Sequence, residues 1–83
     1  MKVHEIKTWP EFFQDIKSGI KTFEYRKDDR LYNYGDYLIL KEYMPDTDFF
    51  TGEELMVKVI YLLRGPKLGI PAGYVIMGIK QVA

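Results

Sequence analysis

The chain is 83 residues long, carries twelve Lys or Arg and twelve Asp or Glu residues, and has no cysteine. This length predicts one domain, residues 1–83, without room for separate cofactor and substrate domains. The balanced charge argues against binding long polyanions through bulk charge, and the lack of cysteine excludes disulfide scaffolds and cysteine-based metal sites. No apolar stretch approaches the roughly 20 residues of a membrane span, and no secretory signal is evident, so we expect a cytoplasmic protein.

The start of the chain predicts a strand followed by a helix. Residues 2–7 read as a short strand. Thr8, with Glu11 three residues later, fits a capping box, and Pro10 suits a first helical turn. We therefore expect a helix over residues 10–18.

Residues 21–27 alternate in the way typical of a strand with two different faces. Phe23 and Tyr25 lie on the face that we expect to be buried. Thr22, Glu24 and Arg26 lie on the opposite, unusually polar face.

The rest of the chain predicts three more strands, over residues 37–43, 55–63 and 74–80. Residues 44–52 and 64–73 are rich in Pro, Gly or Asp, so both are expected to be loops. One helix among consecutive strands indicates an α+β fold. We expect a small curved sheet or open β-barrel of five to six strands, with the helix inserted after the first strand. Closure would remove the exposed edges.

Several familiar chemistries have no support in the sequence. There is no phosphate-binding Gly-rich motif and no nucleophile elbow, and no spacing of acidic or histidine residues indicates a metal site. The only histidine, His4, lies in the first strand, where we interpret it as a structural residue. We expect no cofactor.

The informative cluster consists of charged residues around the second strand, with Lys7 nearby: Lys21, Glu24, Arg26 and Arg30. If this polar face lines a cleft, its cations suit phosphate and its glutamate suits a hydrogen-bond donor of a base or sugar. The alternative is a salt-bridged face exposed to water. Trp9 and Tyr74 stand at element ends, where a stacking platform for bases would be built.

The run of residues 18–26, Ser-Gly-Ile-Lys-Thr-Phe-Glu-Tyr-Arg, resembles the G-x-K-T-x-x-x-R motif of ASCH (activating signal cointegrator homology) domains in the PUA-like superfamily. Residues 34–36 (Tyr-Gly-Asp), 74–79 and 3–10 are similar to other parts of this family, the last to short bacterial and phage members. The resemblance implies a small barrel whose cleft binds RNA or a nucleobase. It also implies that Lys21, Glu24 and Arg26 face that cleft.

Three functions follow as hypotheses, and the first is binding of RNA or a modified nucleotide in this cleft. The second is an amidohydrolase acting on an acylated nucleoside such as acetylcytidine, with Lys21, Thr22 and Glu24 as its residues. The resemblance to ASCH domains includes a branch of such amidohydrolases. Members of that branch carry a catalytic glutamate in a longer insertion before the last strand, and this chain lacks that insertion. The third is a protein-interaction module, with a homodimer formed through Phe49 and Phe50.

Overall fold

The computed structural model describes residues 1–82, so the last residue of the predicted domain, residue 83, lies outside the described part. Its elements, in chain order, are β1 (Val3–Thr8), α1 (Pro10–Lys17), β2 (Phe23–Lys27), β3 (Tyr37–Met44), β4 (Phe49–Arg64) and β5 (Tyr74–Gln81). The prediction of an α+β chain with one helix after the first strand is therefore confirmed. Within residues 1–82, no helix is both long enough and apolar enough to cross a membrane.

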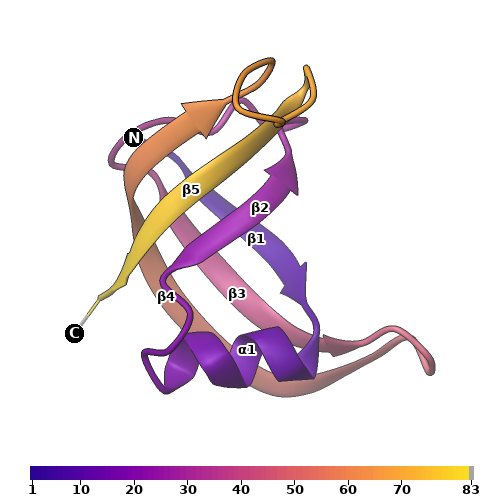
Figure 1. Ribbon diagram of the computed structural model, residues 1–83. Helices are drawn as coiled ribbons and strands as arrows, with labels where there is room; N and C mark the ends of the chain where they lie inside the picture. Colours follow the sequence, from indigo (N-terminus) through magenta and orange to yellow (C-terminus); the bar gives the residue numbers. More distant parts are fainter. Residues whose placement is uncertain (83) are drawn as a thin grey trace.

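The five strands form one sheet in the order β1-β3-β4-β5-β2. β1 runs parallel to β3, and the other neighbouring strands are antiparallel. The sheet curls into a half-barrel, with α1 across one end (Figure 1). β1 and β2 are the edge strands and share no backbone ladder in the described residues, so the barrel is open along this side, as the expectation of a curved sheet or open barrel allows.

The core fills the concave side of the curled sheet. Leu38 and Leu40 of β3 are fully buried, as their alternation predicts, and Phe13 and Ile16 of α1 close the end beneath them. Burying one large aliphatic or aromatic side chain contributes about 1.5–3 kcal/mol. The remaining core side chains come mainly from the two long strands: Val57, Val59, Leu62, Val75, Met77 and Ile79.

The predicted inside and outside of β2 are reversed. Phe23 and Tyr25 are 48% and 49% exposed, whereas Glu24 is only 3% exposed. The cause is the register with β5, in which Glu24 lies opposite Met77. Directly opposed residues share one face of a sheet, and Met77 is in the core. The polar face of β2 therefore points into the half-barrel.

Thr8 has a different role from the predicted cap. The N-cap of α1 is Trp9, which makes no side-chain cap hydrogen bond, so the capping box is wrong. The alternation of β1 buries His4, Ile6 and Thr8 in turn, and it continues to the last residue of the strand. The Thr8 side chain consequently points into the half-barrel with 2% of its surface exposed.

The segment 44–52, predicted to be a loop, is mostly strand. β3 continues to Met44 and β4 begins at Phe49, with Met44 paired to Phe49 and Tyr43 to Phe50. Only residues 45–48 form the turn, since aromatic residues favour the extended conformation. The two strands project from the barrel as a ribbon (Figure 1). Phe49 and Phe50 are exposed there.

Two arginine side chains cross the open side between β2 and β1. Arg26 donates from Nη2 to the carbonyl oxygen of Lys7 at 2.7 Å, and Arg30 donates from Nη1 to the carbonyl oxygen of Glu5 at 2.8 Å. Both acceptors belong to the edge of β1 that no strand pairs. Guanidinium groups thus take the place of a backbone ladder and leave space beneath them.

Candidate functional site

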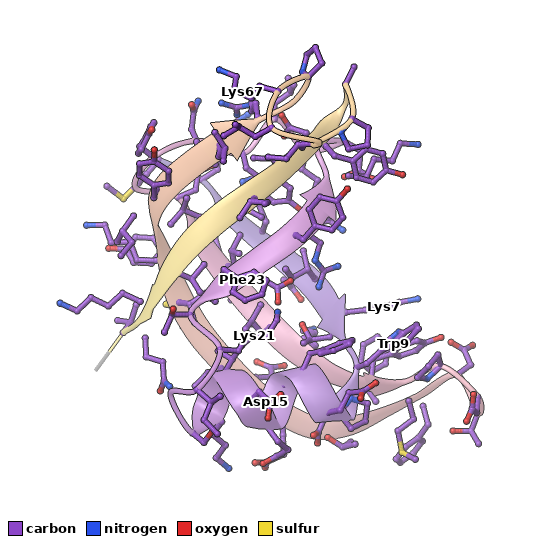
Figure 2. The ribbon with its side chains drawn as sticks, in the orientation of Figure 1. Lys7, Trp9, Asp15, Lys21, Phe23 and Lys67 are labelled. Carbon is purple, nitrogen blue, oxygen red and sulfur yellow. The ribbon has the colours of Figure 1, made fainter. Side chains whose placement is uncertain are left out.

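A cavity of about 420 Å³ lies between the end of β1, the start of α1 and the inward face of β2. We call it the first cavity. Its volume falls within the range of about 300–1,000 Å³ typical of small-molecule sites. Figure 2 shows Lys21 and Phe23 at one side of the space above α1 and Lys7 and Trp9 at the other. The lining residues are Lys7, Thr8, Trp9, Phe12, Lys21, Phe23, Glu24, Tyr25 and Arg26.

The floor of the first cavity holds a buried carboxylate between two cations. Glu24 accepts from Lys21 Nζ at its Oε1 and from Arg26 Nε at its Oε2, each at 2.8 Å. A buried carboxylate requires such partners, because its desolvation is otherwise very costly. Two cations around one anion leave a positive charge beside the cavity.

The Gly-x-Lys spacing places Lys21 at this site. Gly19 adopts a φ of +87° just after α1, a conformation that glycine reaches without steric cost. The chain then turns back, and the amide of Lys21 donates to the Asp15 carbonyl. The Lys21 ammonium also donates to the Phe23 carbonyl at 2.9 Å and lies 4.8 Å from the centre of the Phe23 ring.

Thr8 supplies a hydroxyl that is almost unused. Its Oγ1 lies 3.5 Å from Arg26 Nη2, longer than the usual 2.7–3.2 Å of such bonds. Within residues 1–82, the hydroxyl proton has no recorded acceptor. Thr8 is therefore able to donate to a molecule in the first cavity. Arg26 touches both Thr8 and Glu24 and so links the two sides of the floor.

The walls are aromatic. Trp9 and Phe12 stack with ring centres 6.0 Å apart and planes 21° apart, and Phe23 contributes a third ring. Trp9 is 50% exposed, so part of the wall opens to solvent. Planar apolar rings above a charged floor suit a flat ligand with a polar edge.

The other predicted site residues are distributed around the first cavity. Lys7 lines both the first cavity and a neighbouring one, and Arg30 lines only the neighbouring one. Tyr74 stacks on Tyr25 with ring centres 5.6 Å apart and is not among the lining residues. Thr22 precedes β2, is exposed, and does not line the first cavity. The set Lys21, Thr22 and Glu24 is thus not brought together there.

Sequence reasoning missed four lining residues: Thr8, Phe12, Phe23 and Tyr25. Phe23 and Tyr25 were expected to face the core instead. Thr8 was interpreted as a helix cap, although extending the alternation of His4 and Ile6 would have placed it inside. Phe12 lies three residues after Trp9, a spacing that puts two side chains on one helix surface. The motif around Lys21 gave no signal for Thr8 or Phe12, which lie outside it.

A second buried carboxylate, Asp36, lies outside the first cavity. It accepts from His4 Nε2 at 2.9 Å and from the backbone amides of Lys2 and Asn33 at 2.9 and 3.0 Å. Burial by itself would raise the pKa of Asp36, but these three hydrogen bonds outweigh it and lower that pKa. His4 also packs edge-on against Tyr32, which agrees with a structural histidine. The described residues contain no metal-binding group of three His, Cys, Asp or Glu side chains.

Residues 3–79 match a family described as a domain of unknown function (DUF3850). The chain belongs to this family. It is 38% identical over 58 residues to the "Uncharacterized 12.9 kDa protein in GpA 3'region" of Escherichia phage P2. The match takes in 70% of this chain and 51% of that protein, so the chain spans about half the length of this relative.

A solved structure has the same fold. The crystal structure of hypothetical protein PH0355 matches with a TM-score of 0.68 at 19% sequence identity, over 99% of this chain and all of that one. At this identity the likeness extends to the fold alone. The assignment of the first cavity to a function therefore depends on its own residues.

Proposed function

We propose that this domain binds RNA or a modified nucleotide, and that the first cavity holds the base. The observation that carries the proposal is the buried Glu24 carboxylate, held by Lys21 and Arg26 on the floor of an aromatic-walled cavity. Rings suit stacking on a base, and a fixed carboxylate beside a hydroxyl suits the polar edge of a base.

The arrangement of donors and acceptors favours certain bases. Each oxygen of Glu24 accepts one recorded hydrogen bond and has a second lone pair. Thr8 and Lys21 have hydrogens that remain available as donors. A complementary base carries an N–H group and a carbonyl on one edge, as cytosine, guanine and uracil do. Adenine has no carbonyl, so adenosine is expected to bind most weakly.

The resemblance to ASCH domains supports the same assignment. Its G-x-K-T-x-x-x-R pattern supplies Lys21 and Arg26, and the cleft of such PUA-like domains is where RNA or a nucleobase is expected to bind. A single nucleotide also suits a chain of zero net charge better than a long strand does. We further propose that the protein acts in the cytoplasm, where a chain without cysteine is at home.

Calorimetric titration with cytidine, guanosine, uridine and adenosine tests the proposal. We expect Glu24→Gln to weaken binding of the preferred nucleoside at least about tenfold, since hydrogen bonds to charged groups contribute about 1.5–3 kcal/mol. The matched control is Glu53→Gln, which removes a carboxylate from the exposed pair with Lys17. If none of the four nucleosides binds, or if Glu24→Gln binds them like the parent protein, the proposal is wrong.

An amidohydrolase is the second candidate, and one observation favours it. Thr8 brings a hydroxyl into the cavity that holds Lys21 and Glu24, although Thr22 lies outside. A hydrolase at this site would therefore depend on Thr8. Release of cytidine from acetylcytidine, abolished in Lys21→Ala and in Thr8→Val but retained in Thr22→Val, would support it. No turnover at high protein concentration would rule it out.

A homodimer through the projecting ribbon is a separate proposal. Phe49 and Phe50 are 57% and 45% exposed there, and Lys7 is 5.9 Å from the Phe50 ring centre. Phe50→Ser should halve the mass in solution if the ribbon pairs with a second copy. An unchanged mass, measured by light scattering, argues against this interface.

A further inference from the structure

A second cavity, of about 540 Å³, lies beside the first along the open side between β1 and β2. The two cavities share Lys7 and Arg26 as lining residues. The second cavity extends from this shared boundary toward the segment after β2 and toward β3 and β4. The open side of the half-barrel thus carries two adjoining cavities, which we call the groove, with an aromatic half and a polar half.

The polar half concentrates positive charge in a chain that is neutral overall. Glu5 and Asp29 are its two acidic lining residues. Five lining residues are cationic: Lys7, Arg26, Lys27, Arg30 and Lys41. Local excess of this kind attracts anions even where the net charge of the protein does not.

Three of these cations have no carboxylate partner. Arg26 is paired with Glu24, and Lys41 is paired with Glu5 and Glu54. In contrast, no carboxylate within residues 1–82 lies within 4.0 Å of the charged nitrogens of these three: Lys7, Lys27 and Arg30. They are the cations that an incoming anion would neutralise.

Two of the three are held in place by other contacts. Arg30 donates through Nη1 to the Glu5 carbonyl, which fixes its guanidinium over the groove. Lys7 Nζ lies 4.5 Å from the centre of the Tyr43 ring, a favourable cation–π distance. Groups oriented before binding lose less conformational entropy when the anion arrives.

From this placement, we infer that the second cavity is a phosphate subsite and that the groove selects a phosphorylated nucleotide over a nucleoside. The inference rests on the proposed function, because the first cavity must hold the base. Phosphate oxygens accept hydrogen bonds from guanidinium and ammonium groups, and Arg30 with Lys27 supplies both types. The phosphate belongs either to a free nucleotide or to the backbone of a single strand.

Titration of the preferred nucleoside against its 5′- and 3′-monophosphates and a pentanucleotide of the same base tests this assignment. The variant is Lys27→Gln combined with Arg30→Gln. The matched control, Lys58→Gln combined with Lys80→Gln, removes the same charge from two opposed residues of β4 and β5 that line neither cavity. Lys27→Gln alone guards against a folding defect, since the Lys27 side chain is exposed and forms no ion pair within residues 1–82.

We expect a monophosphate to bind about tenfold more tightly than the nucleoside. The double variant should lose about five- to tenfold for the phosphorylated probes and less than about twofold for the nucleoside. Tightest binding by a monophosphate would assign the site to a free nucleotide. Tightest binding by the pentanucleotide, with a salt slope reduced by about 0.7 for each lost contact, would assign it to a single strand.

Two results would overturn the inference. One is equal affinity for nucleoside and monophosphate. The other is a phosphate effect that the Lys58 and Lys80 control removes as well as the Lys27 and Arg30 variant does. Neither result affects the proposed function, which fails only if the nucleosides themselves do not bind or bind independently of Glu24.

Discussion

Asp36 and Glu24 are two buried carboxylates with 2% and 3% of their surface exposed, yet their surroundings differ. Asp36 accepts from two backbone amides and from the imidazole of His4. Glu24 accepts from the ends of two long cationic side chains, Lys21 and Arg26, which border a cavity. Asp36 is thus held mainly by the backbone, whereas Glu24 is held by side chains beside an open cavity.

This difference separates a carboxylate held by the fold from the one that we propose takes part in binding. The amides that bind Asp36 cannot leave it without moving β1 and the turn before β3, so its hydrogen bonds contribute to folding. The side chains around Glu24 are able to rotate toward a ligand while the backbone stays in place. The proposed function therefore rests on buried charge beside an open cavity and not on buried charge alone.

Replacing Asp36 should have the largest effect on stability. Asp36→Ala leaves two amides and an imidazole without their acceptor, and breaking a buried charged network costs about 3–5 kcal/mol. The total stability of a chain of this length is about 4–12 kcal/mol. Chemical denaturation measures the loss. Asp15→Ala, an exposed aspartate of α1, is the control and should change stability by less than about 0.5 kcal/mol.

The dependence of folding stability on pH should also show the structural role of Asp36. The pKa of Asp36 is lowered in the folded protein. As the pH falls, Asp36 therefore becomes protonated in the unfolded chain first, at about pH 3.9. The contribution of Asp36 is then complete above about pH 5 and is lost as the pH falls through its folded pKa. Denaturation curves between pH 3 and 7 should show a steeper acid loss for the parent protein than for Asp36→Asn.

Glu5, a surface carboxylate, is the control for this loss of stability in acid, which we call the acid limb. The hydrogen bond and charge of Lys41 also lower the pKa of Glu5, but Glu5 is exposed. Exposed ion pairs contribute little to stability. Glu5→Gln should therefore keep the acid limb of the parent protein. An Asp36→Asn limb identical to that of the parent would instead show that Asp36 does not control it.

Glu24→Gln should cost less stability than Asp36→Ala while having the larger effect on binding. The amide keeps the shape and one acceptor for Lys21 or Arg26, so we expect a loss of about 1–2 kcal/mol. Nucleoside binding should fall at least about tenfold, as proposed above. The reverse pattern, with Glu24 the more important for folding, would contradict the distinction between the two carboxylates.

The sequence predicted the elements and the polar face of β2 better than it predicted how they are oriented. Alternation separates Glu24 from Phe23 but does not say which one is inside, since that depends on pairing Glu24 with the core residue Met77. The Gly-Asp turn was visible at residues 35 and 36. The burial of Asp36 was not, because its partners, His4 and Lys2, lie 32 and 34 residues away.

Thr8→Val should have the smallest effect on folding and so isolates the binding role of the first cavity. Valine matches threonine in shape, and the hydroxyl makes only the long 3.5 Å contact with Arg26. We expect stability within about 1 kcal/mol of the parent protein. If the hydroxyl donates to a base, nucleoside affinity should fall about three- to tenfold, measured by the same calorimetry.

Thr51→Val is the control in which the removed hydroxyl has hydrogen-bond partners within the fold. The Thr51 hydroxyl donates to Glu42 at 2.7 Å and accepts from the Glu53 amide at 3.2 Å, and Glu42 is buried. Its removal should lower stability, because a buried carboxylate loses a short hydrogen bond, and should leave binding unchanged. If Thr8→Val behaves like Thr51→Val, the unused hydroxyl of Thr8 belongs to the fold. If only Thr8→Val weakens binding, the polar floor of the cavity includes Thr8 as well as Glu24.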